Sequence, residues 1–417
     1  MISDGQGGAI FTWDDERGAD SDIYAQRINA AGTIQWTGTG VVICNSGGNQ
    51  NYPHLDTDGQ GGAIITWNQP DNIHAQRINS TGEVQWTANG VDVCTQASTQ
   101  TSPNIVSDGQ GGAILAWGDW RSNGAEGTGV DVWAQRINSS GDVKWTVDGV
   151  ELDNSLGNQV SINLATDGQG GAIVSYDDFT GSYDVSAQRV DLDGNVMWAL
   201  NGTVVCDATD FNYIQEVISD GQGGGLFVWD DLRGARVQVY AQRINSSGDA
   251  NWTADGVRTT VSTISSSQGQ NTERPSIVSD DEEGAFLAYK GDAGGDSQIY
   301  LQHIYGNGSN EWASTGIAVC TATGNQQHAV ICHNGPGDVI IAWRDPRSVN
   351  YDVYASRVVN GTLLAGEGGN GGNGDEPEDE EPPAIPGSGI FLIGSISIII
   401  VVLITTRIAK KKRIIYK

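Results

Sequence analysis

The chain has few residues of the kinds that build metal sites and catalytic triads. Among its 417 residues there are five His and five Cys. The histidines fall at unrelated positions, and no Cys pair has the spacing of a metal-binding motif. The sequence therefore gives no indication of a zinc site or of a nucleophile–histidine triad.

Basic residues are also scarce. The chain holds 22 Lys and Arg against 51 Asp and Glu, which gives a formal net charge of −29. Six of the basic residues lie in the last eleven positions, so the remainder is still more acidic. Such a surface repels the phosphates of nucleic acids and anionic lipids, so no nucleic-acid partner is predicted. It favours cations and basic partners, and it also keeps an exposed protein dispersed.

Heptads and apolar faces at helical spacing are missing, and a strand repeat takes their place. Each unit has a Gly-rich turn, an apolar strand and a second strand that typically ends in Ala-Gln-Arg. The units start at seven positions spaced by 50 to 60 residues: Asp4, Asp58, Asp108, Asp167, Asp220, Asp280 and Asn334. This period predicts an all-β, seven-bladed β-propeller with four-stranded blades over residues 1–364. Cys44, Cys94, Cys206 and Cys320 share one repeat position, so we expect buried thiols rather than disulfides.

The second unit carries a specific resemblance. NYPHLDTDGQGGAIITW, followed by the xIxAQRINxxGxVxW pattern of Ile73 to Trp86, resembles the PQQ-like, or quinoprotein-type, propeller repeat. The resemblance implies tryptophans that dock between neighbouring blades, at Trp36, Trp86, Trp145, Trp198, Trp252 and Trp312. It also implies an innermost Gly-Ala-Ile strand and an outermost Pro-containing strand, which would leave the last blade incompletely closed. The likeness is structural and does not imply an enzyme or a quinone cofactor.

The carboxyl-terminal region predicts a membrane anchor. Residues 365–386 are expected to form an acidic Gly/Pro-rich stalk, 387–406 a transmembrane helix and 407–417 a basic tail. By the positive-inside rule the tail is cytoplasmic and the propeller extracellular, in a single-pass protein of the cell membrane. This layout resembles membrane-anchored prokaryotic and archaeal cell-surface propellers. No leader precedes the first repeat, so we expect the natural amino terminus to be missing.

Five Asn-x-Ser/Thr sequons fall at one repeat turn and are candidate glycosylation sites: Asn79, Asn138, Asn245, Asn307 and Asn360. Asn and Ser are also good turn residues, because their side chains satisfy nearby backbone groups. We interpret turn chemistry as the cause of the pattern and glycosylation as its consequence.

Candidate binding residues lie in loops of variable length. Several share a Trp-x-Asp-x-Arg pattern, which predicts either a brace within the loop or a binding surface. The candidates are Asp15, Arg17, Trp120, Asp178, Asp231, Arg233, Asp345 and Arg347. Trp120 is extra to the repeat and could stack on a sugar. No cofactor is predicted with the exception of calcium, for which Asp14, Asp15, Asp230 and Asp231 offer oxygen ligands.

Three functions fit these observations. The main hypothesis is a non-enzymatic cell-surface propeller for binding or adhesion, whose variable loops contact an extracellular protein or glycan. An alternative is a glycoside hydrolase or lyase that acts on extracellular polysaccharide with loop carboxylates. A further alternative is a structural component of a surface coat.

Overall fold

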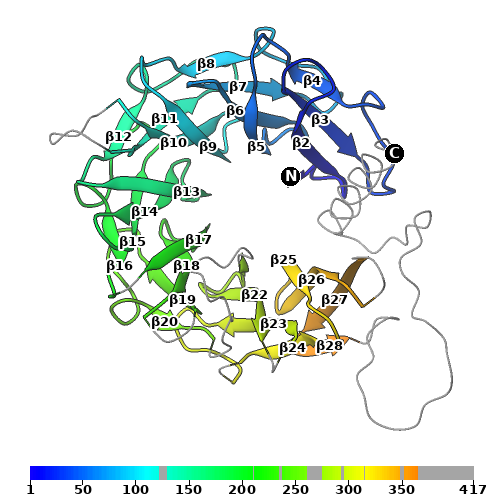
Figure 1. Cartoon of the computed structure of the whole chain (residues 1–417), viewed down its shortest axis with the longest axis vertical. Helices are drawn as coiled ribbons and strands as arrows, with labels where there is room; N and C mark the ends of the chain where they lie inside the picture. The colour runs from blue at the N-terminus through cyan, green and yellow to red at the C-terminus, as the bar shows by residue number, and fades with distance from the viewer. Residues whose placement is uncertain are drawn as a thin grey trace. The chain divides into compact units, whose positions relative to one another are not determined.

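A computed structural model describes residues 1–121, 129–209, 211–233, 237–260, 275–292, 295–313, 315–347 and 352–364. These residues form seven four-stranded antiparallel sheets, and each sheet consists of four strands consecutive in the chain (Figure 1). The described ranges contain no helix, and hence none that could cross a membrane. The predicted stalk, transmembrane helix and basic tail lie outside them.

The strands have the following bounds, sheet by sheet. The first three sheets contain β1 (Ile2–Ser3), β2 (Ala9–Asp15), β3 (Asp22–Ile28), β4 (Val41–Cys44); β5 (Asn51–Thr57), β6 (Ala63–Gln69), β7 (Asn72–Ile78), β8 (Val91–Cys94); and β9 (Gln100–Ser107), β10 (Ala113–Asp119), β11 (Asp131–Ile137), β12 (Val150–Asp153). The fourth and fifth contain β13 (Asn158–Thr166), β14 (Ala172–Phe179), β15 (Tyr183–Val190), β16 (Thr203–Cys206); and β17 (Asn212–Ser219), β18 (Gly225–Asp231), β19 (Gln238–Ile244), β20 (Val257–Arg258). The last two contain β21 (Ser276–Ser279), β22 (Ala285–Asp292), β23 (Ser297–Ile304), β24 (Ile317–Cys320); and β25 (Gln327–Gly335), β26 (Asp338–Asp345), β27 (Asp352–Val359), β28 (Thr362–Leu364).

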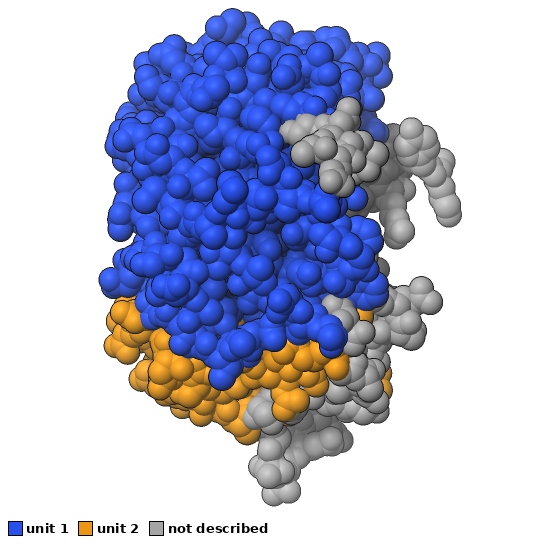
Figure 2. Space-filling view, turned by 90° about the vertical axis from the view of Figure 1, so that its left-hand side faces the viewer, with its two compact units in different colours: residues 1–229, 242–256, 392–417 blue, residues 230–241, 257–391 orange. Residues whose placement is uncertain are grey.

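The described chain forms two compact units (Figure 2). The first comprises Met1–Trp229 and Gln242–Gly256, and the second comprises Asp230–Ala241 and the described residues from Val257 onward. Sheets one to four belong wholly to the first unit, and sheets six and seven to the second. In the first unit the leading strand of each sheet contacts that of the next, β5 with β9, β9 with β13, and β13 with β17. Successive sheets there stand side by side like the blades of a propeller (Figure 1).

The predicted phase of the blade is wrong. The Pro-containing strands, such as β5 and β9, are the leading strands, at the inner ends of the sheets in the first unit (Figure 1). The Gly-Ala-Ile strand is second in its sheet, and the fourth strands β8, β12 and β16, two of which end in Cys, are outermost in the first unit (Figure 1). Pro53 is accommodated because β5 is an edge strand with a register shift between Asn51 and His54. The first and the fourth strand of each sheet are both edge strands. The preference of Pro for edge strands therefore does not say which of the two faces inward.

The last blade is not missing a strand, contrary to the prediction. β28 pairs with β27 through three residues and completes the seventh sheet. At the other end of the chain, Ile2 and Ser3 pair with Ile10 and Ala9 of their own sheet. Every sheet is therefore built from one contiguous repeat.

The Ala-Gln-Arg motif stabilises each repeat through its Gln. In the second repeat, Gln76 Nε2 donates to the carbonyl of Thr87 at 2.8 Å, and its Oε1 accepts from the Trp86 amide at 3.0 Å. Gln76 is fully buried, so these hydrogen bonds replace the water that its carboxamide loses. The motif thereby holds the Trp-containing segment against β7.

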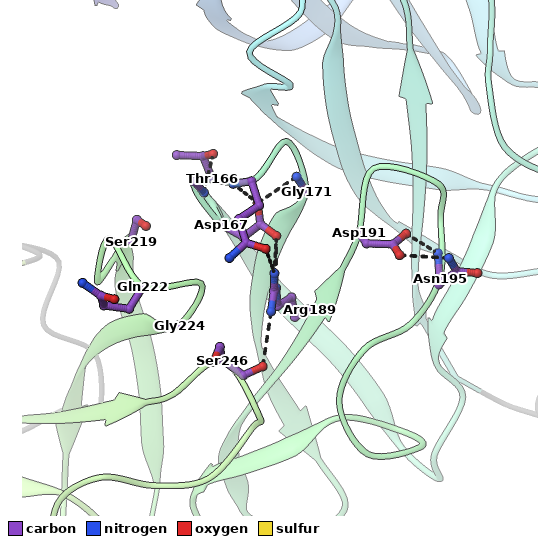
Figure 3. A network of polar contacts seen from close by, with 12 residues as sticks. Thr166, Asp167, Gly171, Arg189, Asp191, Asn195, Ser219, Gln222, Gly224 and Ser246 are labelled. Carbon is purple, nitrogen blue, oxygen red and sulfur yellow. Dashed lines mark hydrogen bonds and ion pairs between the residues drawn. The ribbon is translucent and has the colours of Figure 1, made fainter.

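The Arg of the motif binds the Asp that opens the Gly-rich turn. In the fourth repeat, Asp167 Oδ1 accepts from the amides of Gln169 and Gly171, both at 2.8 Å (Figure 3). Asp167 Oδ2 accepts from Arg189 Nε at 3.0 Å, and Arg189 Nη1 donates to the carbonyl of Ser246 in the next sheet at 3.2 Å. One ion pair thus shapes the turn and connects two sheets.

The repeated tryptophans make a second connection between sheets of the first unit. Their indole nitrogens donate to carbonyls in the following repeat's turn at 3.0 to 3.1 Å, in the pairs Trp36–Ser80, Trp86–Ser139, Trp145–Leu192 and Trp198–Ser246. The turn glycine packs on the same ring: a Cβ on Gly141 would lie 2.9 Å from Trp86 Cγ. In the second unit Gly361 packs in this way on Trp312. Trp252 is half-buried, and its amide donates to Gln242 Oε1 at 3.1 Å.

Candidate functional site

The Trp-x-Asp-x-Arg residues form braces at the ends of strands. In the first repeat, Trp13 Nε1 and Arg17 Nη2 donate to Asp15 Oδ2 at 2.8 and 2.6 Å. The Arg17 guanidinium lies 4.0 Å from the centre of the Tyr24 ring. The hydrogen bond from Arg17 is the main cause that lowers the pKa of Asp15.

The same brace recurs in other repeats. Arg121 pairs with the fully buried Asp119 and stacks on Trp133, at 3.8 Å from the ring centre. Burial opposes ionisation of Asp119, but hydrogen bonds from Arg121 and Trp117 still lower its pKa. The predicted binding pairs Asp231–Arg233 and Asp345–Arg347 are equivalent, and their guanidiniums stack on Tyr240 and Tyr354. Six of the predicted binding residues are thus engaged in interactions within the protein: Asp15, Arg17, Asp231, Arg233, Asp345 and Arg347.

The predicted calcium pairs do not converge on one point. Asp14 and Asp15 are neighbours in β2, and Asp230 and Asp231 are neighbours in β18, so the two side chains of each pair point to opposite faces. Asp15 is already bound by Arg17 and Trp13. Within the described ranges, no group of three or more His, Cys, Asp or Glu side chains is placed to hold a metal ion.

The sequon asparagines build the turns in which they lie. Asn79 Oδ1 accepts from the amides of Thr81 and Glu83, at 3.0 and 2.9 Å. Asn138 and Asn245 accept in the same way from residues two and four positions later, and Asn307 accepts from Ser309. Asn360 adopts a positive φ of 47° at the corresponding turn. These contacts account for the pattern through turn chemistry, while glycosylation stays a prediction.

The fourth repeat departs from the brace. The positions of Trp117 and Arg121 in the third repeat correspond here to Tyr176 and Thr180. Two neighbouring positions differ as well: Asp153, at the end of β12 in the third sheet, stands where Cys94 stands for the brace of the third repeat, and Ser186 stands where Trp133 carries the stacking ring. Asp178, the equivalent of Asp119, therefore has no Arg of its own repeat beside it.

Two carboxyl groups meet at this position. The Tyr176 hydroxyl donates to Asp153 Oδ2 at 2.6 Å, and Gln159 Nε2 donates to Asp178 Oδ1 at 3.0 Å. Ser155 donates to both carboxylates, through its amide to Asp153 at 2.7 Å and its hydroxyl to Asp178 at 3.4 Å. Burial is the main cause that raises the pKa of Asp153 and of Asp178, and the charge of Asp153 raises that of Asp178 further.

The adjoining hairpin adds a third acid. Asp178 of β14 pairs directly with Asp184 of β15, so their side chains lie on one face with Cβ atoms about 4.5–5.5 Å apart. Burial and the charge of Asp178 raise the pKa of Asp184. Asp207, which follows β16, shares a hydrogen bond with Asp255 that raises its pKa. Like-charged carboxyl groups at such spacing retain protons to higher pH than isolated ones.

Four aromatic rings lie together at the end of the β14–β15 hairpin. The Phe179–Tyr183 pair ends the β14–β15 hairpin with ring centres 4.5 Å apart. The Tyr183 ring centre lies 4.9 Å from that of Tyr213, the second residue of β17, and 5.8 Å from that of Phe211, which directly precedes β17. Phe211 is 40% exposed and the other three rings are half-buried. The rings lie on the hairpin face opposite Asp178 and Asp184, because neighbouring strand residues alternate.

Of the predicted binding residues, Asp178 is the one that belongs to the β14–β15 hairpin. Trp120 is 49% exposed in the third repeat, where its amide donates to the Thr99 carbonyl at 3.0 Å. The four aromatic residues, Asp153 and Asp184 were not predicted. The signal that could have found them is the replacement, around one brace position, of the residues that Cys94, Trp117 and Arg121 provide in the neighbouring brace.

Comparisons with known proteins give structural similarities at low sequence identity. No family model matches the chain, and no curated protein matches it. A puromycin hydrolase mutant is similar at 12% identity and a TM-score of 0.49; the match covers 86% of this chain and 51% of the hydrolase, so this chain spans about half its length. A polysaccharide lyase, ulvan lyase, gives 12% identity and a TM-score of 0.49 over 85% of this chain and 90% of the lyase. The α-L-arabinanase of Penicillium chrysogenum gives 16% identity and a TM-score of 0.39 over 76% and 94%.

Proposed function

We propose that this chain degrades an extracellular polysaccharide, as a glycoside hydrolase or lyase, at the rim formed by the β14–β15 hairpin, residues 207–209, Phe211 and the start of β17. The observation that carries the proposal is the departure of the fourth repeat from the brace. Asp15, Asp119 and Asp345 have lowered pKa values, whereas that of Asp178 at the same repeat position is raised. Carboxyl groups with a perturbed pKa are characteristic of functional sites. Here the equivalent Asp15, Asp119 and Asp345 are each paired with an Arg, and Asp178 has no Arg of its own repeat beside it.

The residues of the rim have distinct roles in this proposal. The rings of Phe211 and Tyr213 stack on the apolar faces of sugar units, which is how aromatic side chains bind carbohydrate. Asp207 is assigned as the general acid, because the hydrogen bond that it shares with Asp255 raises its pKa, the direction that suits a proton donor. Asp184 of β15 is assigned as the second carboxylate. Strand β15 and the residue after β16 thus supply the acid pair that glycosidic cleavage requires.

The wider architecture of the proposal is a seven-bladed propeller held at the cell surface by residues 387–406. Seven consecutive four-stranded sheets and the tryptophan contacts between sheets of the first unit support the propeller. The apolar run and the basic residues after it support the anchor.

The test is turnover of a polysaccharide panel by the purified chain, followed as new reducing ends and as unsaturated sugar products. We expect Asp207→Asn and Asp184→Asn each to lower kcat by at least about 100-fold, the scale of general acid–base catalysis. Asp14→Asn, an exposed carboxylate on β2, is the matched control and should be unchanged. Turnover that survives in both rim variants would contradict the proposal.

Binding without turnover is the second candidate, and the exposed aromatic cluster favours it. An adhesin would bind a glycan saturably, yield no products and lose affinity in Phe211→Ala. The same panel separates the two functions.

A further inference from the structure

Trp120 presents an exposed indole on the side of the third sheet that faces the fourth. Its amide donates to the Thr99 carbonyl at 3.0 Å, so the pairing of β10 continues through this residue. Because strand residues alternate, the Trp120 side chain lies on the same face of the sheet as Ile114. That face packs against Ala172 and Val174 of the fourth sheet. The indole therefore lies at the rim, where the third sheet borders the fourth.

Packing of the repeat does not account for this indole. The equivalent residues of other repeats are Glu16, Pro70, Leu232 and Pro346, so no aromatic residue recurs there. Trp120 is 49% exposed, and among the described residues its ring has no ring contact and no hydrogen bond. The ring is thus free to bind a ligand.

A second exposed apolar side chain lies on the same side of the carboxylates. Leu156, in the loop between β12 and β13, is 62% exposed. Its neighbour Ser155 bonds to Asp178 through its hydroxyl at 3.4 Å. A Cβ on Gly157 would lie 2.1 Å from the Phe179 carbonyl oxygen, so the loop runs against the end of β14. Apolar surface therefore borders Asp178 on the side of the third sheet.

The four-ring cluster borders the carboxylates on the opposite side. Phe179 has the position in the fourth sheet that Trp120 has in the third, and it faces the fifth sheet, which leads in with Phe211. Asp178 and Asp184 are half-buried on the face toward the third sheet. Packed sheets lie about 10 Å apart. The rim of the fourth sheet thus has aromatic surfaces on both sides and carboxylates between them.

We infer that a linear glycan chain crosses the rim of the fourth sheet, with one sugar unit stacked on Trp120 and another on Phe211. Aromatic rings bind the apolar faces of sugars, and rings on both sides of the acids hold the chain on both sides of the bond that is cut. The inference rests on the proposed function and deepens it, because it makes the substrate a linear polymer that is cut internally. An enzyme that removes units from a chain end needs no second aromatic platform beyond its acids.

The test measures the binding of linear oligomers to the full chain by calorimetry. The probes are the disaccharide and the octasaccharide of each polymer in a panel of glucan, xylan, mannan and galacturonan. A disaccharide reaches one platform, whereas an octasaccharide reaches both. We expect Trp120→Ala and Phe211→Ala each to lower the affinity for the octasaccharide by about three- to tenfold, the scale of one aromatic contact. Only one of the two variants should lower the affinity for the disaccharide.

Two further variants show whether the ring itself binds the chain. Trp120→Tyr keeps an aromatic ring and should bind the octasaccharide within about twofold of the unchanged chain. Ile34→Ala removes an apolar side chain of similar exposure, 50%, at the opposite end of the first sheet, where Ile34 pairs with Ile28. This control should bind both probes as the unchanged chain does.

The products give a second readout. An octasaccharide labelled at its reducing end should yield labelled fragments of several lengths at the earliest time points. Release of one mono- or disaccharide from a chain end, an unchanged octasaccharide affinity in Trp120→Ala, or equal losses of disaccharide affinity in both ring variants would overturn the inference and leave the proposed function standing. If no oligomer and no polymer is cut, the proposed function fails and the inference fails with it.

Discussion

Replacing Gly141 by Ala should destabilise the contact between the second and third sheets. Gly141 has a φ of +88°, and a Cβ there would lie 2.9 Å from Trp86 Cγ. The left-handed backbone costs an L-residue about 1–2 kcal/mol. Forcing a methyl group against the packed indole costs about 1–3 kcal/mol more. We therefore expect the free energy of unfolding to fall by about 2–5 kcal/mol.

Gly109 provides the control for this prediction. Its φ is +71°, and no atom lies within 4 Å of the position that a Cβ would take. Gly109→Ala should therefore lose only the backbone share, about 1–2 kcal/mol. Urea unfolding followed by tryptophan fluorescence measures both variants, and the midpoints are comparable if the slopes agree. Equal losses in the two variants would refute the claim that the tryptophan and the next turn interlock.

Three other predictions concern buried polar groups. Burial opposes the charged form of His303, but hydrogen bonds to acids including Asp280 raise its pKa. The contribution of His303 to the free energy of unfolding should therefore be full below about pH 6.5 and should fall as the pH rises through the raised pKa. In His303→Arg the free energy of unfolding should no longer change with pH in this range. Arg121→Ala leaves Asp119 buried and unpaired and should cost about 3–5 kcal/mol in a urea titration, and a loss below 1 kcal/mol would contradict the brace. Burial raises the pKa of Cys94 to about 11, so a thiol reagent at pH 8 should modify it in the unfolded chain and spare it in the folded one.

The repeated sheets could be predicted because the residues that stabilise each sheet recur from repeat to repeat. The turn Asp, the Gln and the Arg of one unit all bond to each other or to adjoining turns, so the seven units appear as seven sheets. The phase could not be predicted from the same residues. β5 and β8 are the two edges of one meander, and which edge packs against the next sheet depends on contacts between repeats that no single repeat encodes.

The candidate site was largely hidden from sequence. Asp and Arg in variable loops fit both a brace and a binding surface, and packing against Tyr24 and Trp133 supports the brace. Tyr183 and Phe211 are far apart in the sequence and meet because the start of β15 and the residue before β17 lie side by side. The spacing of residues within one repeat does not predict an aromatic cluster that two different sheets form together.

Departure from the repeat is not sufficient to mark a site, as the second repeat shows. It also lacks the brace, since Gln69 and Asp71 replace the Asp and Arg, and the buried Trp67 indole nitrogen has no hydrogen-bond partner. There the neutral Gln69 bonds to Ser46 at 2.6 Å, so the loss of Arg leaves no buried charge behind. In the fourth repeat the same loss comes with a second carboxylate, because Asp153 at the end of β12 lies near Asp178, and burial raises the pKa of both. This gain of acidic groups, more than the loss of symmetry, is the reason why the proposed function is assigned to the rim around Asp178.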